Sequence, residues 1–129
     1  SHIHAPIFAV GTVNDHVAPW QSVFKINLLA NSQEVTFVLT TGGHNAGIVS
    51  EPGHPGRSYQ MAARHGGQPY VDPLSWAQAT PHSEGSWWPA WEKWLADHST
   101  RRVSPPGLGA PRAGYPPLED APGSYVFQG

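Results

Sequence analysis

The chain has 129 residues, a formal net charge of −2 and no cysteine. A chain of this length forms at most one domain, and its weak negative charge argues against nucleic acid as a partner. The lack of cysteine excludes disulfides, a thiolate nucleophile and zinc–thiolate sites among these residues. No apolar run approaches the roughly 18 residues that a membrane-spanning helix needs.

The first third of the chain has the pattern of a strand, a helix and a second strand. Residues 3–10 are almost wholly apolar, which predicts a buried parallel strand. Pro19 suits the first turn of a helix, and we expect this helix to run to about Asn31. Residues 34–40 are rich in β-branched and aromatic side chains and predict the second strand. We expect the apolar side of the helix to consist of Trp20, Val23, Ile26, Leu29 and Ala30.

The middle of the chain is less regular. Residues 50–73 are dense in glycine and proline and lack a period, which predicts a long surface connection. Residues 73–79 are predicted to form a brief helix, and Ser86 is predicted to cap a helix over residues 87–98. The helical spacing of its apolar stripe favours packing in a core or an interface over a ligand platform. The stripe consists of Trp87, Trp88, Trp91, Trp94 and Leu95.

The last part of the chain holds six prolines after residue 98, which oppose regular structure. We therefore predict two regions, a folded one over residues 1–98 and an extended tail rich in proline and glycine over residues 99–129. The tail is expected to lie over the surface, held by its larger apolar side chains. These are Tyr115, Leu118, Tyr125 and Phe127.

Asp15 follows the first predicted strand and His44 follows the second. Two parallel strands joined by a crossover helix end at the same edge of a sheet, about 4.8 Å apart, so a carboxylate and an imidazole meet there. This is the acid–base half of a catalytic triad, as in α/β-hydrolases, where the chain order is nucleophile, acid, histidine. The nucleophile is then expected upstream of residue 1, and we interpret the chain as a piece of a longer protein. A carboxylate in this place also suits the cap of the next helix.

Four blocks resemble the C-terminal region of polyhydroxyalkanoate synthases, also called poly(3-hydroxybutyrate) polymerases, in the order found in that family. The resemblance covers nearly the whole chain, apart from residues 50–80 and 99–115, and its most specific part is the pairing of the first block with the second. The blocks are Thr12-Val-Asn-Asp-His-Val-Ala-Pro-Trp20, Gly42-Gly-His-Asn-Ala-Gly47, Gly85-Ser-Trp-Trp-Pro-Ala-Trp91 and Ala121-Pro-Gly-Ser-Tyr-Val126.

The resemblance implies the C-terminal part of an α/β-hydrolase fold with a Cys-His-Asp triad. It implies an acyltransferase that polymerises (R)-3-hydroxyacyl-CoA into polyester and releases CoA. Asp15 and His44 match the family's aspartate and histidine, and the cysteine lies outside this sequence, so we expect the chain alone to be inactive. His16 matches the histidine that follows the aspartate. It either hydrogen-bonds beside the triad or orders its loop, and we favour the second role.

Further expectations concern partners and location. The resemblance implies a cytoplasmic enzyme associated with polyester granules, which binds the acyl-CoA and the growing polymer. We expect a homo-oligomer, because a sheet with few strands leaves an open edge that pairs with another copy. No cofactor is expected. No metal site is expected either, because converging ligands are needed and the remaining histidines are scattered, namely His2, His4, His54, His65, His82 and His98.

Two other functions fit the same residues. One is an esterase or depolymerase of the α/β-hydrolase type, with a serine nucleophile upstream of this chain. The other is a non-catalytic module that binds a granule surface or a partner chain. The Gly-Ser-Trp-Trp-Pro block and the terminal Ala-Pro-Gly-Ser-Tyr-Val block favour the synthase over the esterase or depolymerase.

Overall fold

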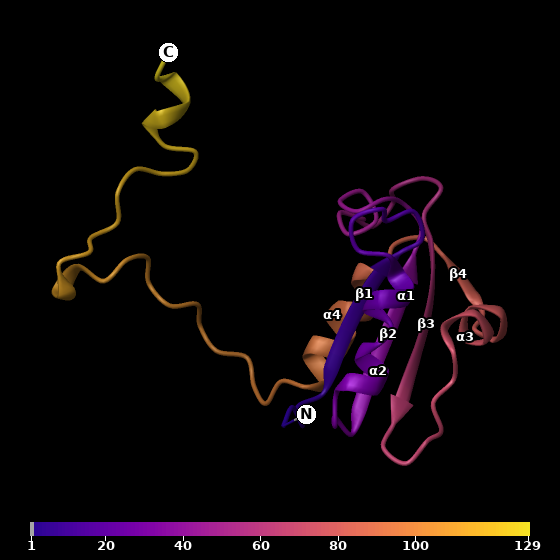
Figure 1. Cartoon of the computed structure of the whole chain (residues 1–129). Helices are drawn as coiled ribbons and strands as arrows, with labels where there is room; N and C mark the ends of the chain where they lie inside the picture. The colour runs from indigo at the N-terminus through magenta and orange to yellow at the C-terminus, as the bar shows by residue number, and fades with distance from the viewer. Residues whose placement is uncertain (1) are drawn as a thin grey trace. The chain divides into compact units, whose positions relative to one another are not determined.

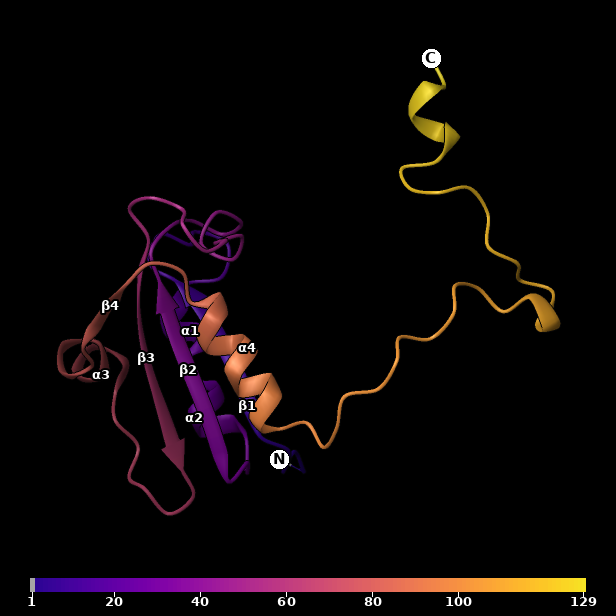
Figure 2. The same ribbon diagram turned by 180° about the vertical axis from the view of Figure 1, so that it is seen from behind.

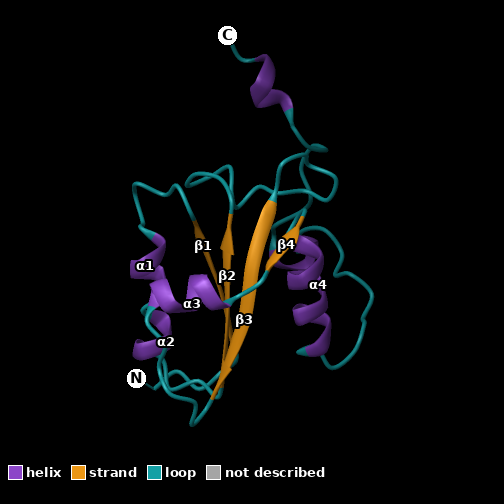
Figure 3. Ribbon diagram, turned by 90° about the vertical axis from the view of Figure 1, so that its right-hand side faces the viewer, coloured by secondary structure: helices purple, strands orange, loops and turns teal. Residues whose placement is uncertain are grey.

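The computed structural model describes residues 2–129 and divides the chain into a unit that ends at His98 and a unit of Ser99–Gly129. The first unit is built on a four-stranded sheet in the order β1–β2–β3–β4, with helices on both faces (Figures 1 and 3). The prediction of an α/β fold is confirmed. β1 and β2 are parallel, whereas the β2–β3 and β3–β4 pairs are antiparallel. The strands are Ile7–Thr12, Glu34–Thr40, Ser58–His65 and His82–Glu84.

β1 and β2 form the parallel pair that the apolar runs predict. β2 has the predicted bounds, but β1 begins four residues after the predicted strand and continues through Gly11 and Thr12. The extension follows from pairing, because Gly11 and Thr12 lie opposite Leu39 and Thr40 of β2. The other edge of β1 pairs with no strand among residues 2–129. Self-association through this edge stays a prediction.

The crossover between these strands is two short helices, α1 (Trp20–Val23) and α2 (Ile26–Leu29), so the prediction of one helix up to Asn31 is wrong. Between them the backbone tightens, because Lys25 N–H donates to Ser22 O, three residues back, at 3.3 Å. The side-chain amide of Asn27 also donates to Phe24 O at 3.1 Å. The predicted apolar side is wrong for Leu29, which is 65% exposed. The buried positions are Trp20, Phe24, Asn27 and Ala30.

β3 and β4 are absent from the prediction, and the surface connection predicted for residues 50–73 is wrong over Ser58–His65. β3 pairs with β2 along its whole length, from Tyr59 opposite Thr40 to His65 opposite Glu34. Its alternation is hidden in the sequence because small alanines occupy both faces and leave little hydrophobic contrast. β4 is short and returns beside β3, with Glu84 opposite Ser58.

One face of the sheet is covered by α1, α2 and α3 (Pro73–Ala79), which has the predicted bounds (Figure 3). Phe37 of β2 lies at the centre of this core and is 1% exposed. Its ring packs edge to face against the rings of Phe24 and of Trp76 in α3, with ring centroids 4.9 and 5.3 Å apart, respectively. Such aromatic pairs add to the stabilisation that burial alone gives.

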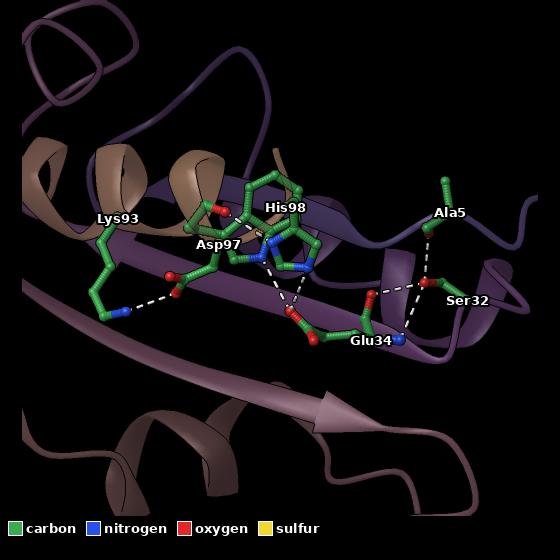
Figure 4. A network of polar contacts seen from close by, with 7 residues as sticks. Ala5, Ser32, Glu34, Lys93, Asp97 and His98 are labelled. Carbon is green, nitrogen blue, oxygen red and sulfur yellow. Dashed lines mark hydrogen bonds and ion pairs between the residues drawn. The ribbon is translucent and has the colours of Figure 1, made fainter. Parts of the chain in front are cut away.

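The opposite face is covered by α4 (Trp88–Asp97), close to the predicted helix (Figure 2). Its C-terminal part is attached to the start of β2, because Trp94 Nε1–H donates to Glu34 Oε1 at 3.0 Å. His98 Nε2 lies 3.6 Å from the same carboxylate oxygen (Figure 4). The ring of His98 stacks on Trp94 at 4.1 Å and donates from Nδ1 to Trp94 O at 2.8 Å. The predicted stripe is only partly packed, since Trp91 and Leu95 are 40% and 42% exposed.

The second unit holds two short 3₁₀ turns, Pro111–Ala113 and Ser124–Phe127, where no regular structure was predicted. The four apolar side chains predicted to hold this tail are all exposed. Their role as anchors stays a prediction. Within residues 2–129, no helix has both the length and the apolar character to cross a membrane.

The core arrangement predicts that Phe37→Ala lowers the free energy of unfolding by about 3–5 kcal/mol, because it leaves a cavity among the packed rings. Leu29→Ala is the matched control, since this side chain is mostly exposed and its loss is expected to cost about 0.5 kcal/mol or less. Urea unfolding followed by tryptophan fluorescence measures both. Equal losses in the two variants would contradict this assignment of the core.

Candidate active site

The loops that follow β1 and β2 leave the sheet side by side. The parallel pairing continues past the strands, because Val13 N–H donates to Thr40 O and Asn14 N–H donates to Gly42 O, both at 3.0 Å. Gly42 has a φ of +108°, a conformation that side chains other than glycine rarely adopt. The two loops lie together beyond the C-terminal ends of β1 and β2 (Figure 1).

Asp15 and His44 meet at this edge, as the strand order predicts. His44 Nδ1 lies 2.8 Å from Asp15 Oδ2. An ionised carboxylate only accepts hydrogen bonds, so the imidazole carries its proton on Nδ1 and donates it. In the neutral ring Nε2 then has a free lone pair. The Asp15 side chain is 8% exposed, whereas that of His44 is 51% exposed, so the imidazole is open to solvent while the carboxylate is covered.

The second oxygen of Asp15 closes its own loop. Oδ1 accepts the backbone N–H groups of Val17 and Ala18, each at 2.8 Å. The hydrogen bond from Ala18, followed by that from His44, holds the pKa of Asp15 below its usual range. The alternative of a helix cap is wrong, because α1 begins at Trp20, its N-cap is Pro19, and no side chain caps it. One carboxylate orders the loop with Oδ1 and binds the imidazole with Oδ2.

His44 belongs to a short helical turn over residues 43–49, which we call the His44 turn. Gly47 N–H donates to Gly43 O and Val49 N–H donates to Asn45 O, both at 2.9 Å. Gly47 packs directly on the end of β1, because a Cβ atom there would lie 2.5 Å from Thr12 Cγ2. Any larger residue at position 47 would push the turn, and with it His44, away from Asp15.

The other side of the His44 turn is contacted by residues 85–88. Trp87 Nε1–H donates to Gly47 O at 3.0 Å, and Trp88 Nε1–H donates to Ile48 O at 2.9 Å. The hydroxyl of Ser86 donates to Ser50 O and accepts the N–H of Trp88. Ser86 thus bonds the first N–H of α4, although the N-cap residue is Trp87 and not Ser86 as predicted. Sequence reasoning missed the two indole contacts because each spans 40 residues. The only sequence signal is that both blocks occur together in the resemblance.

The structure brings none of the other predicted groups to this pair. His16 is exposed, and within residues 2–129 its side chain makes no hydrogen bond. His54 lies beside Arg57, with Nε2 3.4 Å from Nη2. Across the described part of the chain, no three metal-binding side chains gather. The site is therefore a hydrogen-bonded pair of a covered carboxylate and a half-exposed imidazole.

The hydrogen bonds of Asp15 predict a stability change in acid. Because its pKa is lower in the folded state than in the unfolded state, where it is about 3.9, its contribution is complete above that pH. The contribution is lost as the pH falls through the folded-state pKa. We therefore expect the difference in urea midpoint between the parent chain and Asp15→Asn to be largest at neutral pH and to shrink below pH 3.9 or so.

Asp72→Asn is the matched control, since Asp72 caps α3 and hydrogen bonds from Ser75 lower its pKa as well. The difference in urea midpoint between the parent chain and Asp72→Asn is expected to shrink over the same acidic range. This substitution leaves the surroundings of the His44 ring unchanged. Urea midpoints between pH 7 and pH 2.5, with an NMR titration of the Asp15 carboxyl, measure the effect. A difference for Asp15→Asn that does not change with pH would contradict it.

No protein-family model matches the chain. Comparison with individual known proteins gives one consistent result. The chain is 40% identical over 127 residues to poly(3-hydroxyalkanoate) polymerase 2 of Ectopseudomonas oleovorans, covering 93% of this chain and 20% of the relative. It is 39% identical over 126 residues to poly(3-hydroxyalkanoate) polymerase of Methylorubrum extorquens, covering 96% of this chain and 20% of the relative.

The poly(3-hydroxyalkanoate) polymerase subunit PhaC of Cupriavidus necator is 35% identical over 126 residues, which cover 96% of this chain and 20% of the subunit. The chain thus spans about a fifth of the length of the curated relatives that it matches. The resemblance seen in the sequence blocks is confirmed: over nearly its whole length, the chain is homologous to a region of the poly(3-hydroxyalkanoate) polymerases.

Proposed function

We propose that Asp15 and His44 are the acid and the base of a catalytic triad in an enzyme that polymerises (R)-3-hydroxyacyl-CoA. The observation that carries the proposal is the 2.8 Å hydrogen bond between them at the C-terminal edge of two parallel strands. This chain order and edge suit the acid and histidine of an α/β-hydrolase fold. The homology to poly(3-hydroxyalkanoate) polymerases supports the polyester product.

The nucleophile in this proposal is a cysteine of the parent enzyme outside these 129 residues, since the chain has none. Nε2 of His44 removes the thiol proton, and the thiolate attacks the thioester carbonyl carbon of the substrate. The bond from this carbon to the CoA sulfur breaks, and the acyl group stays on the cysteine. The proton held by His44 passes to the departing CoA thiolate.

Chain growth then needs a second nucleophile, the 3-hydroxyl group of an acyl unit. A base at the same site removes the hydroxyl proton, and the oxygen attacks the acyl-cysteine carbonyl carbon, which forms the ester and releases the thiolate. Nε2 of His44 is free for this step, and we propose that Asp15 also helps to activate the hydroxyl. An imidazole suits both proton transfers because its ordinary pKa lies near neutrality.

The role of Asp15 follows from its hydrogen bonds. Its lowered pKa keeps the carboxylate ionised at neutral pH, so it holds the Nδ1 proton of His44 and stabilises the imidazolium that forms during the reaction. The side chain of His16 is exposed, and the role of ordering the loop stays a prediction.

The proposed setting is the cytoplasm, at the surface of polyester granules, with the acyl-CoA and the growing polymer as partners and a homo-oligomer as the active form. The homology supports this setting through the polymer named in the relatives. The weak net charge gives no support to a nucleic acid partner. The chain by itself is proposed to be inactive.

The test is CoA release from (R)-3-hydroxybutyryl-CoA. The chain is placed in the Cupriavidus necator polymerase subunit instead of the matching 126 residues. We expect the chimera to release CoA and the free chain to release none. In the chimera, Asp15→Asn and His44→Ala are expected to lower the rate about 10,000-fold, as loss of a triad member does, whereas His16→Ala causes a much smaller loss.

Circular dichroism and molecular mass confirm that each variant folds like the chimera. Unchanged CoA release after His44→Ala would contradict the proposal. A chimera that hydrolyses simple esters but releases no CoA would favour the esterase or depolymerase. A folded chimera without either activity would favour the non-catalytic module.

A further inference from the structure

Residues 85–88 contact the His44 turn through the indole N–H groups of Trp87 and Trp88. We propose that Trp87 and Trp88 are positioning residues, whose indole N–H groups hold the His44 turn so that His44 stays in hydrogen-bond reach of Asp15. This inference rests on the proposed function of His44 as the catalytic base. The sequence alone gives these tryptophans only a packing role.

The first argument is where the two indoles donate. Gly47 O and Ile48 O lie three and four residues after His44 and accept the indole N–H groups at 3.0 and 2.9 Å. Within the described chain, neither carbonyl receives a backbone N–H. The carbonyls at the end of a helical turn need partners from elsewhere, and here neighbouring tryptophans supply both.

The second argument is how firmly the indole of Trp87 is held. Its side chain is 5% exposed and stacks on Phe8 at 6.2 Å between ring centroids. Phe8 belongs to β1, the strand that leads into the Asp15 loop. The His44 turn therefore contacts β1 twice, directly where Gly47 meets Thr12 and indirectly through Trp87. Both partners of the acid–base pair take their position from one strand.

The third argument is the path of the chain. β4 ends at Glu84, opposite the start of β3, and the N–H of Gly85 donates to Arg57 O at 2.7 Å. Gly85 has a φ of +92°, which turns the chain sharply. Residues 85–88 thus reach the same edge as the His44 turn before α4 descends over the opposite face (Figure 2). This path explains what the short strand β4 contributes to the site.

A tryptophan that only fills space does not need its N–H group, and this distinguishes the proposal from plain packing. The test replaces Trp87 by 3-benzothienylalanine, which has sulfur in place of the N–H group and almost the same shape. We expect the pKa of Asp15, followed by NMR, to rise toward its ordinary value as the hydrogen bond from His44 weakens. The rise is partial, because the bonds from Val17 and Ala18 remain.

The matched control is the same replacement at Trp91, whose indole makes no hydrogen bond within the described chain, and it is expected to leave the pKa of Asp15 unchanged. His44→Ala is the positive control and gives the largest rise. Trp88→Phe provides a second variant in case the first does not fold, since Trp88 is less buried than Trp87. An unchanged pKa of Asp15 in the Trp87 and Trp88 variants, beside a rise in His44→Ala, would overturn the proposal.

In the chimera, the replacement at Trp87 is expected to lower kcat by about 100-fold through misplacement of the base, with little change in KM. A loss confined to KM would also overturn the positioning role. The proposed function fails separately, if His44→Ala retains activity. In that case a raised pKa of Asp15 in the Trp87 variant would still establish that the tryptophans hold the turn.

Discussion

The parallel pairing of β1 with β2 is the constraint on which the rest of the site depends. It carries the ends of both strands to one edge, and the pairing continues into the loops through Val13 and Asn14. With β2 reversed, its seven residues would separate the two loops by roughly 20 Å, at about 3.3 Å per residue. The crossover of α1 and α2 makes this direction possible and also covers the aromatic core around Phe37.

The acid–base pair is built mainly from hydrogen bonds rather than from burial. Asp15 accepts hydrogen bonds from its own loop with one oxygen and from His44 with the other. The bonds that order the loop therefore also orient the carboxylate toward His44. On the His44 side, Gly47 lies between Thr12 and the indole of Trp87. The imidazole of His44 therefore stays half exposed, yet its backbone is held by two contacts.

The parts predictable from sequence are those with a local pattern. The apolar run of β2 and the cap of α3, where Asp72 precedes Pro73, are encoded in adjacent residues. The meeting of Asp15 and His44 follows from strand order alone. The sequence does not predict β3, because its alanines make the alternation of apolar and polar residues weak. The position of β3 depends on backbone pairing with β2. The contacts of Trp87 and Trp88 span 40 residues and have no local pattern.

The tautomer of His44 tests the central claim most directly. The account predicts that in the neutral ring Nδ1 carries the proton and Nε2 does not, because the Asp15 carboxylate only accepts. The ¹⁵N chemical shifts of the imidazole in labelled protein at alkaline pH measure this, with Asp15→Ala as the comparison. A proton on Nε2 in the parent chain, unaffected by loss of the carboxylate, would contradict the acid–base pair and the function built on it.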